Sequence, residues 1–63
     1  MSPGERRRNI LEHLLLAREL PIKKLAHELG VHEVTIRRDL AELEQEGLLE
    51  VIRGGARIFE QAQ

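Results

Sequence analysis

The sequence contains no cysteine, tryptophan or tyrosine, and Phe59 is its only aromatic residue. Without cysteine, the chain can form neither a disulfide nor a thiolate metal site. Proteins that bind single-stranded nucleic acid stack bases on aromatic side chains, and RNA-recognition sheets use the same contact. The sequence therefore argues against both classes, and it predicts a core built from leucine, isoleucine and valine.

Long apolar runs are also missing. The longest run of leucines, Leu14-Leu15-Leu16, is far too short to span a membrane, and no signal peptide is visible. The histidines at positions 13, 27 and 32 have no partners at metal-ligand spacing, and no Ser/His/Asp or Cys/His catalytic set is visible. We therefore expect a cytoplasmic protein that is not an enzyme, needs no cofactor or metal, and has no membrane partner.

The net charge of −1 disfavours nucleic acid as a partner when taken alone, but charges of each sign are grouped along the chain. The separated basic groups are Arg6, Arg7, Arg8, Lys23, Lys24, Arg37, Arg38, Arg53 and Arg57. An acidic group follows them as Glu42, Glu44, Glu46 and Glu50. A folded chain can place such groups on opposite sides, which would give one cationic face and one anionic face.

Capping signals indicate where a first helix begins. Ser2 and Glu5 have the spacing of a capping box, and Pro3 suits the first helical position because its missing N–H would be unpaired there. The apolar stripe of this helix is Ile10, Leu11, Leu14 and Leu15. Pro21 biases the residue before it away from helical dihedral angles, so we expect the helix to end near residue 18 or 19.

The next segment has the pattern of two helices joined by a short turn. Apolar residues at helical spacing predict a helix over 22–29, and Gly30 follows it as a natural left-handed cap. A third helix is expected from His32 to about Glu46, where Gly47 stops it. Two helices separated by a three- to four-residue turn around a glycine predict a helix-turn-helix.

The segment after Gly47 has the features of a β-hairpin. Residues 48–53 are β-prone, Gly54-Gly55 is a two-residue turn signal, and residues 56–60 form the return. Both alternating sets within 48–52 contain aliphatic side chains, so the sequence leaves open which set faces inward. We predict a mainly α fold with a small β-hairpin, a winged helix-turn-helix of three helices plus a wing over residues 1–60. Residues 61–63 are expected to begin a linker or to fray.

Two adjacent arginines, Arg37 and Arg38, lie one turn inside the third helix. Ile36, Leu40 and Leu43 mark the buried stripe of that helix, and both arginines lie off it. The second helix of a helix-turn-helix presents its N-terminal residues to the major groove of DNA. We therefore expect both arginines to contact bases or phosphates. The alternative is that one of them forms a structural ion pair with an acidic neighbour.

Asp39 lies close to the buried stripe, where an exposed carboxylate would repel DNA. We expect it to be a structural partner for an arginine from the first helix or from the wing.

Further candidate contacts surround the two arginines. Unpaired amides at the start of the third helix can receive a phosphate, and the side chains there are His32, Glu33, Val34 and Thr35. Thr35 could instead be a capping side chain, and Glu33 a favourable first-turn acid. The cations expected near phosphates are Lys23 and Lys24, Arg6 and Arg7, and Arg53 and Arg57 beside the wing turn. A solvated charged face is the alternative for the lysines and for Arg6 and Arg7.

Four segments carry a family resemblance. They are Arg6-Arg7 before Ile10-Leu11, Leu25-Ala26 followed by Gly30-Val31, Thr35-Ile36-Arg37-Arg38-Asp39-Leu40, and Gly47-Leu48-Leu49 leading to Gly54-Gly55-Ala56. In these segments the chain resembles the N-terminal DNA-binding domain of DeoR-type bacterial transcription regulators. One departure from the family pattern is His32, which replaces the usual serine and is a weaker N-cap.

The resemblance implies sequence-specific binding to double-stranded DNA by a transcription regulator, typically a repressor of sugar-metabolism genes. It also implies, in a longer chain, a C-terminal domain that binds a phosphorylated sugar and drives homo-oligomerisation. Winged helices are also used for protein–protein association and for RNA binding, so these two functions are the alternatives.

Overall fold

The computed structural model describes residues 2–59, so the expected linker or tail over 61–63 lies outside the described residues. The first helix, α1, spans Pro3–Ala17. The capping box predicted at its start is confirmed, because the Ser2 hydroxyl accepts from the amide of Glu5 and the Glu5 carboxylate accepts from the amide of Ser2, each at 3.2 Å. The helix ends close to the predicted place, with Arg18 as a C-cap at a φ of +73°.

The predicted helix-turn-helix is present. Helix α2 spans Ile22–Leu29 as expected, and Gly30 ends it in the left-handed conformation with a φ of +68°, which glycine adopts without steric cost. Helix α3 spans Glu33–Gln45, so the predicted ends at His32 and Glu46 are its two caps.

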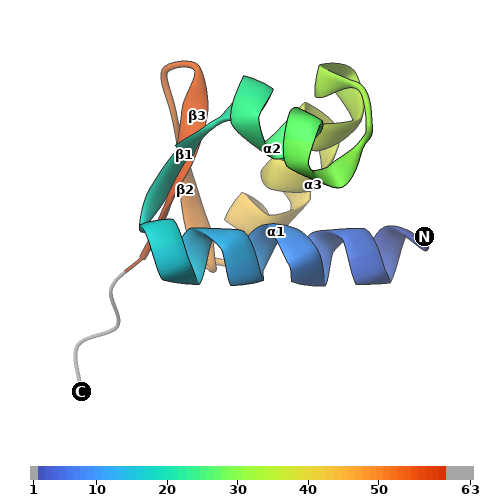
Figure 1. Ribbon diagram of the computed structural model, residues 1–63. Helices are drawn as coiled ribbons and strands as arrows, with labels where there is room; N and C mark the ends of the chain where they lie inside the picture. Colours follow the sequence, from blue (N-terminus) through green and yellow to red (C-terminus); the bar gives the residue numbers. More distant parts are fainter. Residues whose placement is uncertain (1, 60–63) are drawn as a thin grey trace.

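The β structure is larger than the predicted hairpin. Strands β2 (Leu49–Ile52) and β3 (Gly55–Ile58) form the hairpin, and a third strand, β1 (Glu19–Pro21), pairs with the other side of β3. The sheet is antiparallel with the order β1-β3-β2 (Figure 1). Because β1 is an edge strand, its proline is tolerated there without breaking the ladder. The sheet thereby connects the end of α1 to the wing.

The hairpin turn lies one residue earlier than predicted. The turn residues are Arg53 and Gly54, whereas Gly55 belongs to β3, opposite Ile52 on one side and Pro21 on the other. A Cβ atom at Gly55 would lie 2.4 Å from the carbonyl oxygen of Leu20, so the close approach of β1 requires glycine here. The expected Gly54-Gly55 turn is therefore wrong by one position, because the second glycine serves strand packing.

Neither alternating set of the wing faces wholly inward. Leu49 is fully buried at the base of the hairpin, while Val51, on the same side of the strand, is 38% exposed. Leu48 and Ile52, from the other set, are half buried. Burial therefore depends on distance from the helices as well as on strand parity.

The core is aliphatic, as predicted, and lies where α1 crosses beneath α2, α3 and the sheet (Figure 1). Its members are Ile10, Leu14, Ile22, Leu25, Ala26, Ile36, Leu40, Leu43, Leu49, Ala56 and Ile58. Within residues 2–59, the only buried polar or charged side chain is that of Asp39. No helix in this part of the chain has both the length and the apolar character needed to cross a bilayer.

Replacement of Gly55 by alanine tests the close approach of β1 to β3. We expect Gly55→Ala to lower the free energy of unfolding by about 1–3 kcal/mol, because the added methyl group forces β1 away from β3. Urea unfolding monitored by circular dichroism measures the change.

The matched control is Gly4→Ala in α1, where an added Cβ would meet no atom within 4 Å. This change should raise the free energy of unfolding by up to about 1 kcal/mol, since alanine favours the helix over glycine. Equal stability of the two variants would contradict the proposed packing.

Candidate nucleic-acid interface

The outward face of α3 carries the two arginines found in the sequence. Ile36 and Leu40 are fully buried, and Arg37 and Arg38 are both exposed, so the expectation that the guanidinium groups stand clear of the core is confirmed. The side chain of Arg37 is 59% exposed and lies 3.4 Å from a carboxylate oxygen of Glu33 one turn earlier. Within the described residues, Arg38 makes no hydrogen bond or ion pair with any side chain. It is therefore available to an external acceptor.

The first turn of α3 is open to solvent. His32 is the N-cap in an extended conformation, and its side chain makes no capping hydrogen bond, consistent with histidine being a poor cap. Val34 is exposed, and Thr35 is half buried with its amide donating to the His32 carbonyl at 3.0 Å. Glu33 is half buried and holds Arg37. This ion pair gives Glu33 a structural contact, while contact between Glu33 and DNA stays a prediction.

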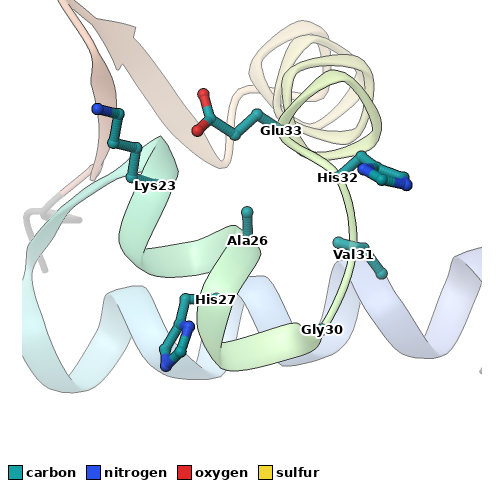
Figure 2. A pocket seen from close by; sticks show the side chains of 7 residues that line it. All are labelled: Lys23, Ala26, His27, Gly30, Val31, His32 and Glu33. Atoms are coloured by element: carbon teal, nitrogen blue, oxygen red, sulfur yellow. The ribbon is translucent and has the colours of Figure 1, made fainter.

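A hollow of about 480 Å³ lies between α2 and the start of α3. Figure 2 shows Lys23 on α2 and Glu33 on α3 on either side of the space above Ala26, while the ring of His32 is directed away from Ala26. The hollow is lined by Lys23, Ala26, His27, Gly30, Val31, His32 and Glu33. Its walls are the two helices of the helix-turn-helix, so α2 places Lys23 beside the start of α3.

The lysines of α2 and the arginines of the wing differ in how firmly they are held. Lys24 lies 3.8 Å from Glu28 on the next turn of α2, whereas Lys23 has no ion partner within the part of the chain that is described. Arg57 pairs with Glu50 across the hairpin at 2.6 Å, and this hydrogen bond raises the pKa of Arg57 above its ordinary value. Arg53, in the wing turn, is exposed and has no side-chain partner in residues 2–59.

The wing is fastened to both helices of the helix-turn-helix. The amide of Val51, on the outer strand of the sheet, donates to a carboxylate oxygen of Glu44 in α3 at 2.9 Å. The amide of Ile22, at the start of α2, donates to the carbonyl of Gly54 in the wing turn at 2.8 Å. Sequence reasoning placed Glu44 only in an acidic group and missed this contact, which joins side chain to backbone across seven residues.

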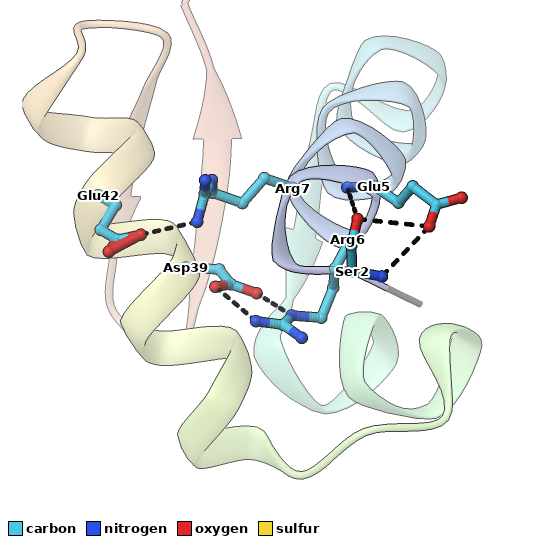
Figure 3. Close-up of polar contacts among 6 residues, drawn as sticks. All are labelled: Ser2, Glu5, Arg6, Arg7, Asp39 and Glu42. Carbon is cyan, nitrogen blue, oxygen red and sulfur yellow. Dashed lines mark hydrogen bonds and ion pairs between the residues drawn. The ribbon is translucent and has the colours of Figure 1, made fainter.

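Arg6 and Arg7, expected near phosphates, are directed at α3 instead (Figure 3). The Nε and Nη2 atoms of Arg6 donate to the two carboxylate oxygens of Asp39, with Nη2 at 3.1 Å from Oδ1. This hydrogen bond raises the pKa of Arg6. Arg7 Nη1 lies 2.9 Å from a carboxylate oxygen of Glu42. The prediction that Asp39 pairs with an arginine of the first helix or of the wing is confirmed, with Arg6 of the first helix as the partner. Phosphate contact by Arg6 and Arg7 stays a prediction.

Comparison with known proteins identifies the family. The family model described as the DeoR-like helix-turn-helix domain matches residues 6–62. A transcriptional regulator of Haloferax volcanii, GlpR, is 45% identical over 56 residues, which cover 89% of this chain and 22% of the relative. The lactose phosphotransferase system repressor of Lactococcus lactis is 38% identical over 59 residues, covering 94% of this chain and 23% of the relative.

A third relative, the uncharacterised regulator YgbI of Escherichia coli, is 42% identical over 55 residues, covering 87% of this chain and 22% of the relative. The chain thus spans about a fifth of the length of these curated relatives. No solved structure matches it. The match over nearly the whole chain, on a fold with the expected three helices and wing, shows that this protein belongs to the DeoR-like helix-turn-helix family, the non-enzymatic DNA-binding domains of transcription regulators.

Proposed function

We propose that this chain binds a specific sequence of double-stranded DNA by inserting α3 into the major groove. The observation that carries the proposal is the exposed Arg37–Arg38 pair on a helix whose opposite face is fully buried. A guanidinium fork matches the two acceptors that guanine presents in the major groove. Arg38 is the first candidate for a base contact because no carboxylate in the described residues holds it. Arg37 is shared with Glu33 and can contact a base or a phosphate.

The surroundings of α3 are suited to hold the DNA backbone. The backbone amides of Glu33 and Val34, which directly follow the N-cap His32, can receive one phosphate. Lys23 and Lys24 would contact the backbone from α2, which crosses it in this motif. Val34 lies on the same exposed turn and would contact the groove through apolar atoms. In the wing, Arg53 and Arg57 would reach the backbone or the minor groove, Arg53 more readily since Arg57 is held by Glu50.

The arrangement of ion pairs makes a net charge of −1 compatible with DNA binding. Three members of the acidic group, Glu42, Glu44 and Glu50, are engaged with Arg7, the Val51 amide and Arg57. The cations left without a side-chain partner in residues 2–59 include Lys23, Arg38 and Arg53. These three lie on α2, α3 and the wing turn, so uncompensated positive charge is shared by the elements proposed to meet DNA.

We further propose that the chain acts within a longer regulator of sugar-metabolism genes, most simply as a repressor. The relative from Lactococcus lactis is named for repression of a lactose phosphotransferase system, and the relatives are about four times the length of this chain. The remainder of such a protein would supply a C-terminal domain that binds a phosphorylated sugar and joins the subunits. Its place of action would be the cytoplasm. In a symmetric dimer, the distance between the two DNA-binding domains sets the spacing of the two half-sites on DNA.

Selection of bound duplexes from a random DNA pool tests sequence-specific recognition. The chain is fused to a dimerising helix pair, so that two copies act together, and bound duplexes are sequenced after repeated rounds. We expect an enriched motif with twofold symmetry, and affinity for it should fall steeply as salt rises because phosphate contacts release counterions. An unenriched pool, or stronger competition by hairpin RNA than by duplex DNA, would overturn the proposal.

Single substitutions on α3 test the two arginines. Arg38→Ala should weaken binding to the enriched duplex by about tenfold or more, the discrimination given by one bidentate base contact. Arg37→Ala should weaken binding by a smaller factor. Both variants should keep the melting temperature of the parent, because the side chains are exposed.

Arg8→Ala on α1 is the matched control, since it removes the same charge from an exposed residue that does not lie on α3. Its affinity loss should be small and equal for all duplexes. Parent affinity in Arg38→Ala, or a loss no larger than that of Arg8→Ala, would rule out the proposed role.

A further inference from the structure

Two ion pairs join the start of α1 to the middle of α3 (Figure 3). Arg6 and Arg7 are consecutive on α1, and their partners, Asp39 and Glu42, are three residues apart on α3. The Asp39 side chain is 2% exposed and that of Arg6 is 17% exposed, whereas the side chains of Arg7 and Glu42 are 32% and 51% exposed. The Arg6–Asp39 pair is therefore largely buried, and the Arg7–Glu42 pair lies next to it, closer to the surface.

We propose that Arg6 is a positioning residue for DNA recognition, and that Arg7 supports it. Arg6 fixes the rotation of α3 about its own axis, and thereby the direction in which Arg38 points, without touching DNA. This proposal rests on the placement of α3 in the major groove proposed above. This proposed role differs from the expectation, drawn from the sequence, that Arg6 and Arg7 contact phosphates.

The physical reason begins with the buried carboxylate. A carboxylate removed from water is strongly unfavourable unless a paired cation and hydrogen bonds compensate it. The two donors of Arg6 form a planar fork that meets both oxygens of Asp39, so it defines the plane and direction of the carboxylate and not only its charge. Consecutive residues on a helix are rotated by about 100°. Once Asp39 is fixed, the direction of its neighbour Arg38 follows.

The other end of the link is also held. The amide of Arg6 donates to the Ser2 carbonyl at 2.9 Å, in the turn that the Ser2–Glu5 capping box closes. The α1 backbone is therefore ordered where the fork begins. Arg7 then reaches Glu42, which lies three residues beyond Asp39 on α3. Because α1 contacts α3 at two positions along its axis, Asp39 and Glu42, the helix is restrained against both rotation and tilt.

A positioning role and a phosphate contact predict different effects on specificity. Loss of a phosphate contact weakens binding uniformly across sequences and lowers the dependence of affinity on salt by about one unit of slope. Loss of the correct direction of Arg38 weakens binding to the preferred sequence more than to others. The ratio of affinities for the enriched duplex and for a scrambled duplex of the same composition therefore separates the two roles.

Conservative and truncating variants of Arg6 provide the first test. Lysine keeps the charge of Arg6 but loses the fork, so we expect both Arg6→Lys and Arg6→Ala to lower the affinity ratio by about tenfold. Arg8→Ala, the control two residues away on α1, should leave the ratio unchanged. An unchanged ratio in Arg6→Lys would overturn the proposal, whether the affinity for both duplexes stays at the parent level or falls equally, as the loss of a phosphate contact would make it. No preference in the parent protein would instead mark failure of the proposed DNA recognition.

Exchange of the charges of Arg7 and Glu42, the more exposed pair, provides a second test if circular dichroism shows that the Arg6 variants unfold. Arg7→Glu and Glu42→Arg each break the second pair, and the double variant restores it with the charges exchanged. Each single variant should lower the affinity ratio several-fold, and the double variant should recover most of it. Because the ratio compares two duplexes with equal charge, changes in net charge cancel. Failure of the double variant to recover the ratio would contradict the role of this link.

Discussion

The carboxylate of Asp39 has to be compensated inside the domain, and this requirement organises the contact between two helices that are distant in sequence. Arg6 supplies the compensation with both a charge and two directed hydrogen bonds. A hydrophobic pair of similar volume would remove the cost of burial, but it would leave α3 freer to rotate against the aliphatic core. Leucine and isoleucine side chains pack by shape and make no hydrogen bonds. The polar link therefore adds two directed hydrogen bonds to the packing of the apolar core.

Three acidic side chains, at the end of α3 and in β2, each make a different structural contact. Glu42 braces α1, Glu44 caps a backbone amide of the outer wing strand, and Glu50 holds Arg57 across the hairpin. An exposed strand edge is a site where another chain can add, and a carboxylate on its amide reduces that risk. These contacts also explain why net charge is a poor guide to function in this domain. What matters is which cations remain without an internal partner.

Most of the helical architecture could be predicted from the sequence because its signals are local. The capping box at Ser2, the left-handed cap at Gly30 and the apolar spacing of α2 each lie within a few residues of the feature they specify. Strand β1 could not be predicted, because it is three residues long, contains Pro21 and is stabilised by a partner more than thirty residues later. The turn position was wrong for a related reason. Gly55 is required by the approach of β1, and that strand was not foreseen.

The sequence predicted which residues of α3 are exposed, but it did not predict which side chains form ion pairs. Periodicity alone separated Arg37 and Arg38 from the buried stripe of α3, since burial follows helical geometry. It could not decide which of several arginines would hold Asp39, because Arg6 lies 33 residues away along the chain. The choice between a guanidinium that orients a helix and one that faces solvent is made by tertiary packing. The family resemblance likewise indicated DNA binding without assigning these partners.

The hydrogen bond from the Ile22 amide to the Gly54 carbonyl has a consequence for how domains of this design diversify. Surface loops ordinarily accept insertions at little cost. Here the tip of the hairpin is bonded to the first residue of α2, so added residues in the turn would break a contact between two separate elements. Variation in hairpin length is thus coupled to the position of α2. New binding preferences are more accessible through side-chain changes on α3 than through remodelling of the hairpin.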